Sequence, residues 1–119
     1  MIKMVALYTK KATLSREEFV RHYEEVHAPL VLKHAPMIRK YVRNHITTLP
    51  GVPGDEGPDF DCITEWWFDD MEALEAVSNL YMSEAGKVLR DDEENFLDKS
   101  NVVHLLVEEE ISDIQDVTS

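Results

Sequence analysis

The alternation of apolar and polar residues predicts four β-strands, each a short run rich in strand-forming side chains. The second run shows the period of two most clearly, because Tyr41, Arg43 and His45 fall on one face and aliphatic residues fall mainly on the other. The predicted strands cover residues 1–10, 37–49, 61–68 and 102–110.

A first helix is predicted where apolar residues recur at intervals of three and four. Ser15 and Glu18 have the spacing of a capping box, in which each residue satisfies a backbone N–H of the other. The helix that follows carries Phe19, Tyr23 and Val26 on one stripe. We therefore expect this helix to begin at residue 15 and to bury that stripe.

The first helix is expected to break or kink near His27, because Pro29 disfavours helical backbone at the residue before it. A short helical piece over residues 30–35 follows. A second long helix begins near Met71, with Asp69 or Asp70 as its cap, and further helical turns are expected within residues 83–97. Residues 50–60, rich in glycine and proline, are expected to form a loop.

The order strand, helix, strand, strand, helix, strand predicts an α+β fold of the ferredoxin-like βαββαβ type, with an antiparallel sheet and helices on one face. Residues 1–111 form this domain, and residues 112–119 are expected to be a flexible tail. Both faces of the predicted strands carry large apolar side chains, so the face without helices needs a cover. We expect a homodimer whose sheets pack face to face and enclose a cavity.

Composition and charge narrow the classes of function. A chain of 119 residues is one domain, and its net charge of −12 opposes nucleic-acid binding. The acidic runs at residues 91–94 and 108–110 are expected to be solvated surface, since they lack the spacing of a calcium loop. No apolar run is long enough to span a membrane and no signal-peptide core is present, which predicts a cytoplasmic protein with no membrane partner.

The histidines are the first candidates for chemistry. There are five, and His22, His27 and His34 lie close together in the chain. A separation of five residues puts His22 and His27 on different faces of a helix, unlike the i, i+4 pair of a zinc site, so no metal is expected. The single cysteine, Cys62, excludes an internal disulfide and is more typical of a core residue than of a nucleophile.

His27 has two interpretations. At the helix break its ring can point into a neighbouring cavity as a general acid or base, or it can cap the helix and fix the bend. Tyr41, Arg43 and His45 supply polar groups to the same cavity, or Arg43 and His45 mark an exposed strand end. Glu65, if it lies beneath the helices, needs a partner and has its pKa raised, or it serves as a structural acceptor.

Three segments resemble one known family. The segment SREEFVRHYEEVHAPL at residues 15–30, with its HxxxxHAPL motif, looks like the EthD domain family of the dimeric α/β-barrel superfamily. The match continues through residues 36–41 and again at residues 64–74, TEWWFDDMEAL. The resemblance covers residues 1–110 and implies a ferredoxin-like monomer and a barrel-forming homodimer.

The resemblance also implies a function. Relatives act on small, often aromatic or lactone-type molecules without metal or organic cofactor, by isomerisation, cyclisation or decarboxylation. A histidine and a tyrosine of the EthD-like pocket match His27 as general acid or base and Tyr41 as the group that orients a substrate oxygen. Some such enzymes carry a cysteine where this chain has Trp66, which is expected to form a wall of the pocket. Further substrate contacts are expected from His22, Arg39, Arg43, His45 and Trp66, with Arg39 or Arg43 pairing with a substrate carboxylate.

Two other functions are compatible with the sequence. The chain could be a non-catalytic carrier or auxiliary protein of a catabolic operon, or a dimeric barrel that binds haem through one histidine. A bound molecule recovered unaltered would favour the carrier, and the colour of the purified protein would reveal haem.

Overall fold

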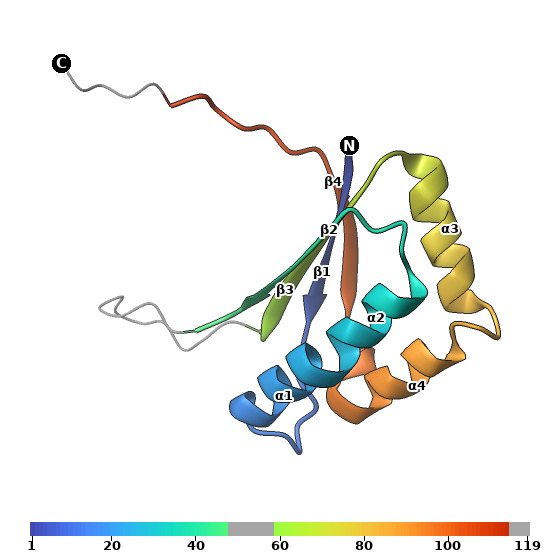
Figure 1. Cartoon of the computed structure of the whole chain (residues 1–119). Helices are drawn as coiled ribbons and strands as arrows, with labels where there is room; N and C mark the ends of the chain where they lie inside the picture. The colour runs from blue at the N-terminus through green and yellow to red at the C-terminus, as the bar shows by residue number, and fades with distance from the viewer. Residues whose placement is uncertain (48–58, 115–119) are drawn as a thin grey trace.

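A four-stranded antiparallel sheet forms one layer of the protein, and the helices form the other (Figure 1). The computed structural model describes residues 1–47 and 59–114. The sheet has the order β2-β3-β1-β4, in which every neighbouring pair is antiparallel. Its strands are β1 (Ile2–Tyr8), β2 (Lys40–His45), β3 (Cys62–Phe68) and β4 (Val103–Val107). The predicted ferredoxin-like α+β fold is thereby confirmed.

The helical layer consists of two groups on the same face of the sheet (Figure 1). The first group connects β1 to β2, and the second connects β3 to β4. Their elements are α1 (Arg16–His22), a π-helical turn η1 (Tyr23–His27), α2 (Ala28–His34), α3 (Met71–Met82), α4 (Lys87–Phe96) and the 3-10 turn η2 (Lys99–Asn101).

The predicted helix caps are present. Ser15 Oγ accepts a hydrogen bond from the backbone N–H of Glu18 at 3.1 Å, and Glu18 Oε1 accepts one from the N–H of Ser15 at 3.0 Å. Asp70 caps α3 by accepting a hydrogen bond from the N–H of Ala73 at 2.9 Å. Local sequence therefore sets where both helices begin.

The expected break near His27 is replaced by the π-helical turn, which keeps the chain helical. The N–H of Ala28 donates to the carbonyl of Tyr23, one residue further back than in an α-helix. The widened turn precedes Pro29, whose ring would clash with the carbonyl four residues earlier in a regular helix. It also turns His27 inward, to 5% exposure, while Val26 is 44% exposed and does not join the predicted apolar stripe.

The turn between α3 and α4 depends on Gly86. A Cβ at this position would collide with the carbonyl oxygens of Leu80 and Tyr81, so only glycine allows the close approach. Arg90 adds hydrogen bonds from its guanidinium to the carbonyls of Tyr81 and Ser83. The helix α4 that follows this turn has ten residues, more than the turn or two predicted for this segment.

The two faces of the sheet have different environments. On the face toward the helices, Ala6, Cys62, Thr64 and Phe68 are fully buried. The opposite face, which we call the back face, has no described helix over it (Figure 1). Strand register assigns to the back face Lys3, Val5, Leu7, Lys40, Val42, Asn44, Ile63, Glu65, Trp67, Val103, Leu105 and Val107.

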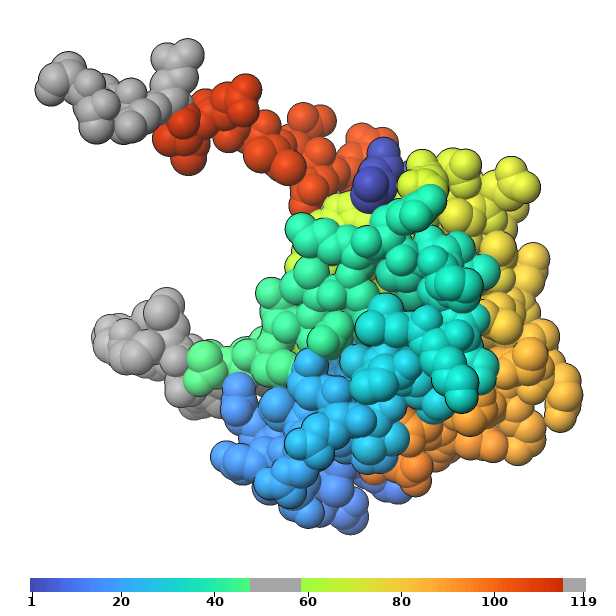
Figure 2. All heavy atoms as spheres, in the orientation of Figure 1, coloured from blue at the N-terminus to red at the C-terminus, as the bar shows by residue number. Residues whose placement is uncertain are grey.

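Several predictions concern the segments between and after the strands. Strand β2 is shorter than the predicted 37–49, and most of the predicted loop 50–60 lies outside the described residues. Residues 108–114 contain neither helix nor strand; Glu109 lies 2.6 Å from Nζ of Lys3, and the segment after it extends away from the rest of the molecule (Figure 2). The remainder of the predicted tail, residues 115–119, lies outside the described residues. Within residues 1–47 and 59–114, no helix has the length and apolar character required to cross a membrane.

Candidate functional site

A cavity of about 380 Å³ lies between the helices and the sheet. Strands β1, β3 and β4 contribute Tyr8, Trp66 and His104 to its wall, and the helical layer contributes His27 and Glu93. This cavity lies within one chain, whereas the cavity expected between the sheets of two copies stays a prediction. The helices stand off the sheet here, so the space forms on the helix side.

His27 is held in the cavity wall by a carboxylate of α4. Its Nδ1 lies 2.9 Å from Asp92 Oδ2, and the other oxygen of Asp92 lies 2.9 Å from Nε2 of His22. Burial lowers the pKa of His27, although the hydrogen bond to Asp92 and the charge of Glu93 oppose this effect. Burial alone would raise the pKa of Asp92. Hydrogen bonds from His27, Asn95 and His22 outweigh this effect, so the pKa is lowered.

This arrangement prepares His27 for proton transfer. An ionised Asp92 accepts a hydrogen bond, so a neutral His27 donates through Nδ1–H and carries its lone pair on Nε2. Nε2 is then the ring nitrogen available to the cavity. A neutral imidazole with a lowered pKa is a competent general base at neutral pH.

Tyr8 contributes a phenol to the cavity wall, and its ring contacts those of Trp66 and His104. Its ring makes edge contacts with Trp66 at 6.3 Å and with His104 at 6.0 Å between centroids. Burial, followed by the charge of Glu93, raises the pKa of Tyr8 well above its ordinary value, and burial lowers that of His104. Tyr8 therefore remains a hydrogen-bond donor at neutral pH.

Glu93 supplies a carboxylate to the same cavity. It is 7% exposed, accepts a hydrogen bond from the hydroxyl of Tyr81, and lies 3.0 Å from Nζ of Lys99. Asp92, its neighbour on α4, is 9% exposed. The expectation that residues 91–94 are solvated surface is therefore wrong for these two. Their burial follows from the amphipathic face of α4, since Leu89, Asp92, Glu93 and Phe96 are all buried at helical spacing.

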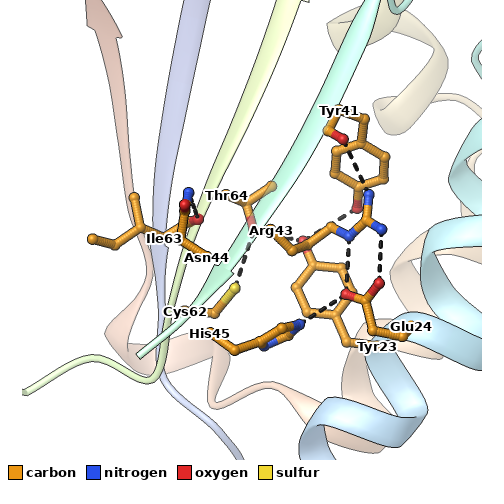
Figure 3. A network of polar contacts seen from close by, with 9 residues as sticks. All are labelled: Tyr23, Glu24, Tyr41, Arg43, Asn44, His45, Cys62, Ile63 and Thr64. Carbon is orange, nitrogen blue, oxygen red and sulfur yellow. Dashed lines mark hydrogen bonds and ion pairs between the residues drawn. The ribbon is translucent and has the colours of Figure 1, made fainter. Parts of the chain in front are cut away.

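Tyr41 lies on the predicted face of β2 but is not among the residues that line the cavity. Its hydroxyl donates to that of Tyr23 at 3.2 Å, and the hydroxyl of Tyr23 lies 2.7 Å from Thr64 Oγ1 (Figure 3). Its ring stacks on Trp66 with the planes 12° apart. Burial raises the pKa of Tyr41. Tyr41 thus supports the wall residue Trp66 from outside.

Arg43 and His45 are also engaged outside the cavity, by Glu24 of η1 (Figure 3). The guanidinium of Arg43 donates to both carboxylate oxygens, at 2.7 and 3.0 Å, and His45 Nε2 lies 2.8 Å from Oε2. The hydrogen bonds from Arg43, followed by those from His45, lower the pKa of Glu24 to about 2 against the opposing effect of burial. This cluster ties β2 to the turn that carries His27.

The other basic residues expected at the site are elsewhere. Arg39 pairs with Asp69 at 2.8 Å on the surface, and His22 faces a second hollow beside Arg21 and Asn95. Of the predicted site residues, the structure brings His27 and Trp66 into the cavity wall, and it does not place His22, Arg39, Tyr41, Arg43 and His45 there. Each of these five has a polar partner elsewhere in the fold. A position on a shared strand face therefore does not determine whether a side chain reaches the cavity.

Two further expectations concern side chains away from the cavity. Glu65 points to the back face and not beneath the helices. On that face it pairs with Lys3 at 2.5 Å and accepts a hydrogen bond from Asn44 at 2.9 Å. The hydrogen bond from Lys3 is the main reason that the pKa of Glu65 is lowered; the raised pKa was expected only for a Glu65 beneath the helices. Cys62 is buried, and burial raises the pKa of its thiol to about 11, which leaves it a poor nucleophile.

Sequence reasoning missed Tyr8, Tyr81, Glu93 and His104 as cavity residues. The strand period offered a signal for Tyr8 and His104, since strand register puts both on the face that the helices cover. Tyr81 and Glu93 depend on how α3 and α4 pack, for which the sequence carries no comparable signal. In the part of the chain that the structure describes, no three histidine, cysteine or acidic side chains gather as metal ligands.

Comparison with known proteins gives matches in sequence and in structure. The family model of the EthD domain matches residues 11–100. The crystal structure of an EthD family protein from Bacillus halodurans superimposes with a TM-score of 0.67 at 25% identity, covering 92% of this chain and 99% of that one.

Two more distant structures show the same fold. An EthD-like protein from Ralstonia eutropha has a TM-score of 0.59 at 18% identity, and covers 89% of this chain and 86% of its own. A dimeric protein of ferredoxin-like fold from Bacteroides fragilis has a TM-score of 0.58 at 11% identity, and the match covers 90% of this chain and 94% of that one. No curated protein sequence matches this chain significantly.

Proposed function

Because the chain belongs to the EthD domain family, we propose that it is an enzyme that moves a proton on a small ring molecule bound beside His27. The substrate is an aromatic or lactone-type compound, and the reaction is an isomerisation, cyclisation or decarboxylation. The observation that carries this proposal is the pairing of His27 with Asp92 in the wall of a largely apolar cavity. The mechanism requires neither a metal nor an organic cofactor.

The cavity has the size and lining that such a substrate needs. Its volume of about 380 Å³ falls within the range of about 300–1,000 Å³ that is typical of small-molecule sites. Trp66, Tyr8 and His104 offer flat faces and edges against which a ring can pack. The aliphatic side chains of Val31, Leu89 and others complete a largely apolar wall.

The proton transfer uses two groups. Nε2 of His27 takes a proton from a carbon next to a carbonyl, and the C–H electron pair moves to the carbonyl oxygen to give an enolate. Tyr8 donates a hydrogen bond to that oxygen, the role that the family resemblance implied for Tyr41. The protonated His27, stabilised by Asp92, then returns the proton to another carbon.

The residues expected to bind substrate but found outside the cavity act in this proposal as positioning residues. Tyr41 fixes the plane of Trp66 by stacking on it. Arg43 and His45 hold the turn of His27 through Glu24, and His22 shares Asp92 with His27. Arg39, paired on the surface with Asp69, has no part in this arrangement.

Deuterium exchange tests the proposal even though the natural substrate is unidentified. A panel of enolisable ring ketones and unsaturated lactones is incubated with the protein in D₂O, and loss of C–H signal next to the carbonyl is followed by ¹H NMR. We expect the protein to accelerate exchange of at least one compound, and His27→Gln to lower that rate by about 10²–10⁴. His34→Gln is the matched control, since His34 bonds the carbonyl of Leu30 and does not line the cavity.

Two results would contradict catalysis by His27. Exchange that persists at the wild-type rate in a folded His27→Gln variant would remove His27 from the reaction. Compounds that bind but never exchange would favour the carrier function, in which the same cavity stores a molecule unchanged.

We also infer that a second copy of the chain covers the back face. That face carries Val5, Val42, Ile63 and Trp67 without a described helix over them, and the structurally similar protein from Bacteroides fragilis is described as dimeric. Size-exclusion chromatography with light scattering should give twice the chain mass of 13.8 kDa. Trp67→Glu should shift the protein to the monomer, and a wild-type monomer would contradict the inference.

A further inference from the structure

The charged groups of the cavity are unevenly distributed. Glu93 brings a carboxylate into the wall, and neither lysine nor arginine occurs among the described residues that line it. Arg39 and Arg43, which the sequence suggested for a substrate carboxylate, are bound to Asp69 and Glu24 away from the cavity. A ligand in this space therefore meets an acidic group and no lysine or arginine, and burial lowers the pKa of the two histidines in the wall, His27 and His104, which disfavours their charged forms.

The carboxylate of Glu93 is also positioned to accept a hydrogen bond. Among the described residues, the hydroxyl of Tyr81 and the ammonium of Lys99 both contact Oε1. Neither bonds Oε2, so one oxygen keeps its acceptor capacity. The side chain of Glu93 is 9% exposed and that of Lys99 is 31% exposed, and Lys99 is not among the described residues that line the cavity.

From this arrangement we propose that Glu93 binds a hydroxyl group of the ligand and selects neutral phenols or enols over carboxylates. This inference rests on the proposed function, since it specifies the substrate class of the same cavity. Hydrogen bonds to ionised acceptors are stronger than those between neutral groups, and this one forms at a side chain that is largely buried. A ligand carboxylate at the same place would meet a like charge and lose its own hydration.

The selection has a chemical consequence for the reaction. A hydroxyl bound at Glu93 fixes one end of the ring, and His27 on η1 and Tyr8 on β1 act from other parts of the wall. A phenol or enol hydroxyl is what a proton-transfer enzyme of this kind forms or consumes. Glu93 is thus a substrate-binding residue that determines specificity, distinct from the base His27.

Calorimetric titration with 2-naphthol and 2-naphthoate at pH 7 measures the selection directly. The two probes share one ring system, and at this pH the phenol is neutral while the carboxylate is ionised. We expect wild-type protein to bind 2-naphthol at least about tenfold more tightly, which matches the contribution of one hydrogen bond to a charged group. Glu93→Gln should abolish or reverse that preference, because it removes the like charge and leaves Lys99 without its partner.

Two further variants separate this effect from a general loss of charge or of folding. Glu94→Gln makes the same change on the same helix at a side chain that is 70% exposed, and should leave the preference unchanged. Lys99→Met keeps Glu93 and removes its counter-charge, so it should strengthen the preference for 2-naphthol. Circular dichroism checks that each variant is folded. If Glu93→Gln does not fold, Lys99→Met still tests the role of Glu93.

The outcomes distinguish this inference from the function on which it rests. Equal binding of both probes by the wild type, or a preference that Glu93→Gln and Lys99→Met leave unchanged, would overturn the role of Glu93 alone. Normal selection for 2-naphthol without any deuterium exchange would support Glu93 and overturn catalysis. If neither probe binds, the cavity does not admit ring molecules and both fail.

Discussion

The ion-pair cluster around Glu24 gives the most quantitative prediction. Glu24 belongs to the π-helical turn that ends at His27, and it connects this turn to β2 through Arg43 and His45. Replacement of this glutamate by glutamine removes the charge and keeps the size of the side chain. The variant Glu24→Gln therefore tests whether this carboxylate stabilises the turn that positions His27.

The expected magnitude follows from the pKa of Glu24. A fall from 4.5 to about 2 corresponds to about 3.4 kcal/mol at ~1.36 kcal/mol per pKa unit. The side chain is 35% exposed, so solvent screening and lost side-chain entropy reduce this to about 1–2 kcal/mol. The pKa is depressed in the folded state, so the stabilisation is complete above pH 4.5 and is lost as the pH falls toward 2.

Urea unfolding followed by circular dichroism, at one fixed protein concentration, measures the effect. At about pH 6 we expect Glu24→Gln to be about 1–2 kcal/mol less stable than wild type, and at about pH 3 this gap should fall to less than half. Glu25→Gln is the matched control on the same turn. Glu25 is exposed, so its substitution should change stability by less than about 0.5 kcal/mol at either pH.

Two results would refute this reasoning. A gap of the same size at both pH values would mean that the ionised form of Glu24 contributes nothing beyond its shape. A variant as stable as wild type at pH 6 would mean that the ion pairs with Arg43 and His45 do not hold the turn in solution.

Three other perturbations have definite expected outcomes. Asp92→Asn should lower the pKa of His27 further, because it removes the carboxylate whose hydrogen bond and charge oppose the effect of burial. NMR titration of the imidazole signals measures this pKa, and a raised value would contradict the prediction. Ser15→Ala should cost about 1 kcal/mol of stability in urea unfolding through loss of the capping box, and an unchanged midpoint would argue against it. Gly86→Ala should cost about 2 kcal/mol or more by the same assay, since its Cβ meets the carbonyl of Leu80, and a neutral effect would contradict the close approach.

Much of the fold could be predicted because it depends on local signals. The capping box of Ser15 and Glu18, the cap at Asp70 and the period of two in β3 each determine an element through residues close together in sequence. The effect of Pro29 was predicted only in part. A proline disfavours a regular helix, but whether the chain breaks or adopts a π-helical turn depends on the packing of Tyr23 and His27 below it.

The candidate site was less predictable because it depends on contacts between distant segments. His27 and Trp66 were identified from motif and strand face, and both line the cavity. The acidic run at residues 91–94 gave no hint that Asp92 would bind two histidines or that Glu93 would be buried. The apolar back face suggested a cavity between two sheets, which stays a prediction, and gave no hint of the cavity between the helices and the sheet of one chain.

The central claim is that ring molecules bind on the helix side of the sheet, and the two tryptophans provide the most direct measurement. Trp66 and Trp67 are consecutive in β3 and point to opposite faces, toward the cavity and toward the back face. Titration of ¹⁵N-labelled protein with 2-naphthol separates the two, because each indole gives one N–H signal. We predict that the Trp66 signal shifts in a saturable manner while the Trp67 signal stays in place. A shift of Trp67 without Trp66 would contradict the claim and locate the ligand between the sheets.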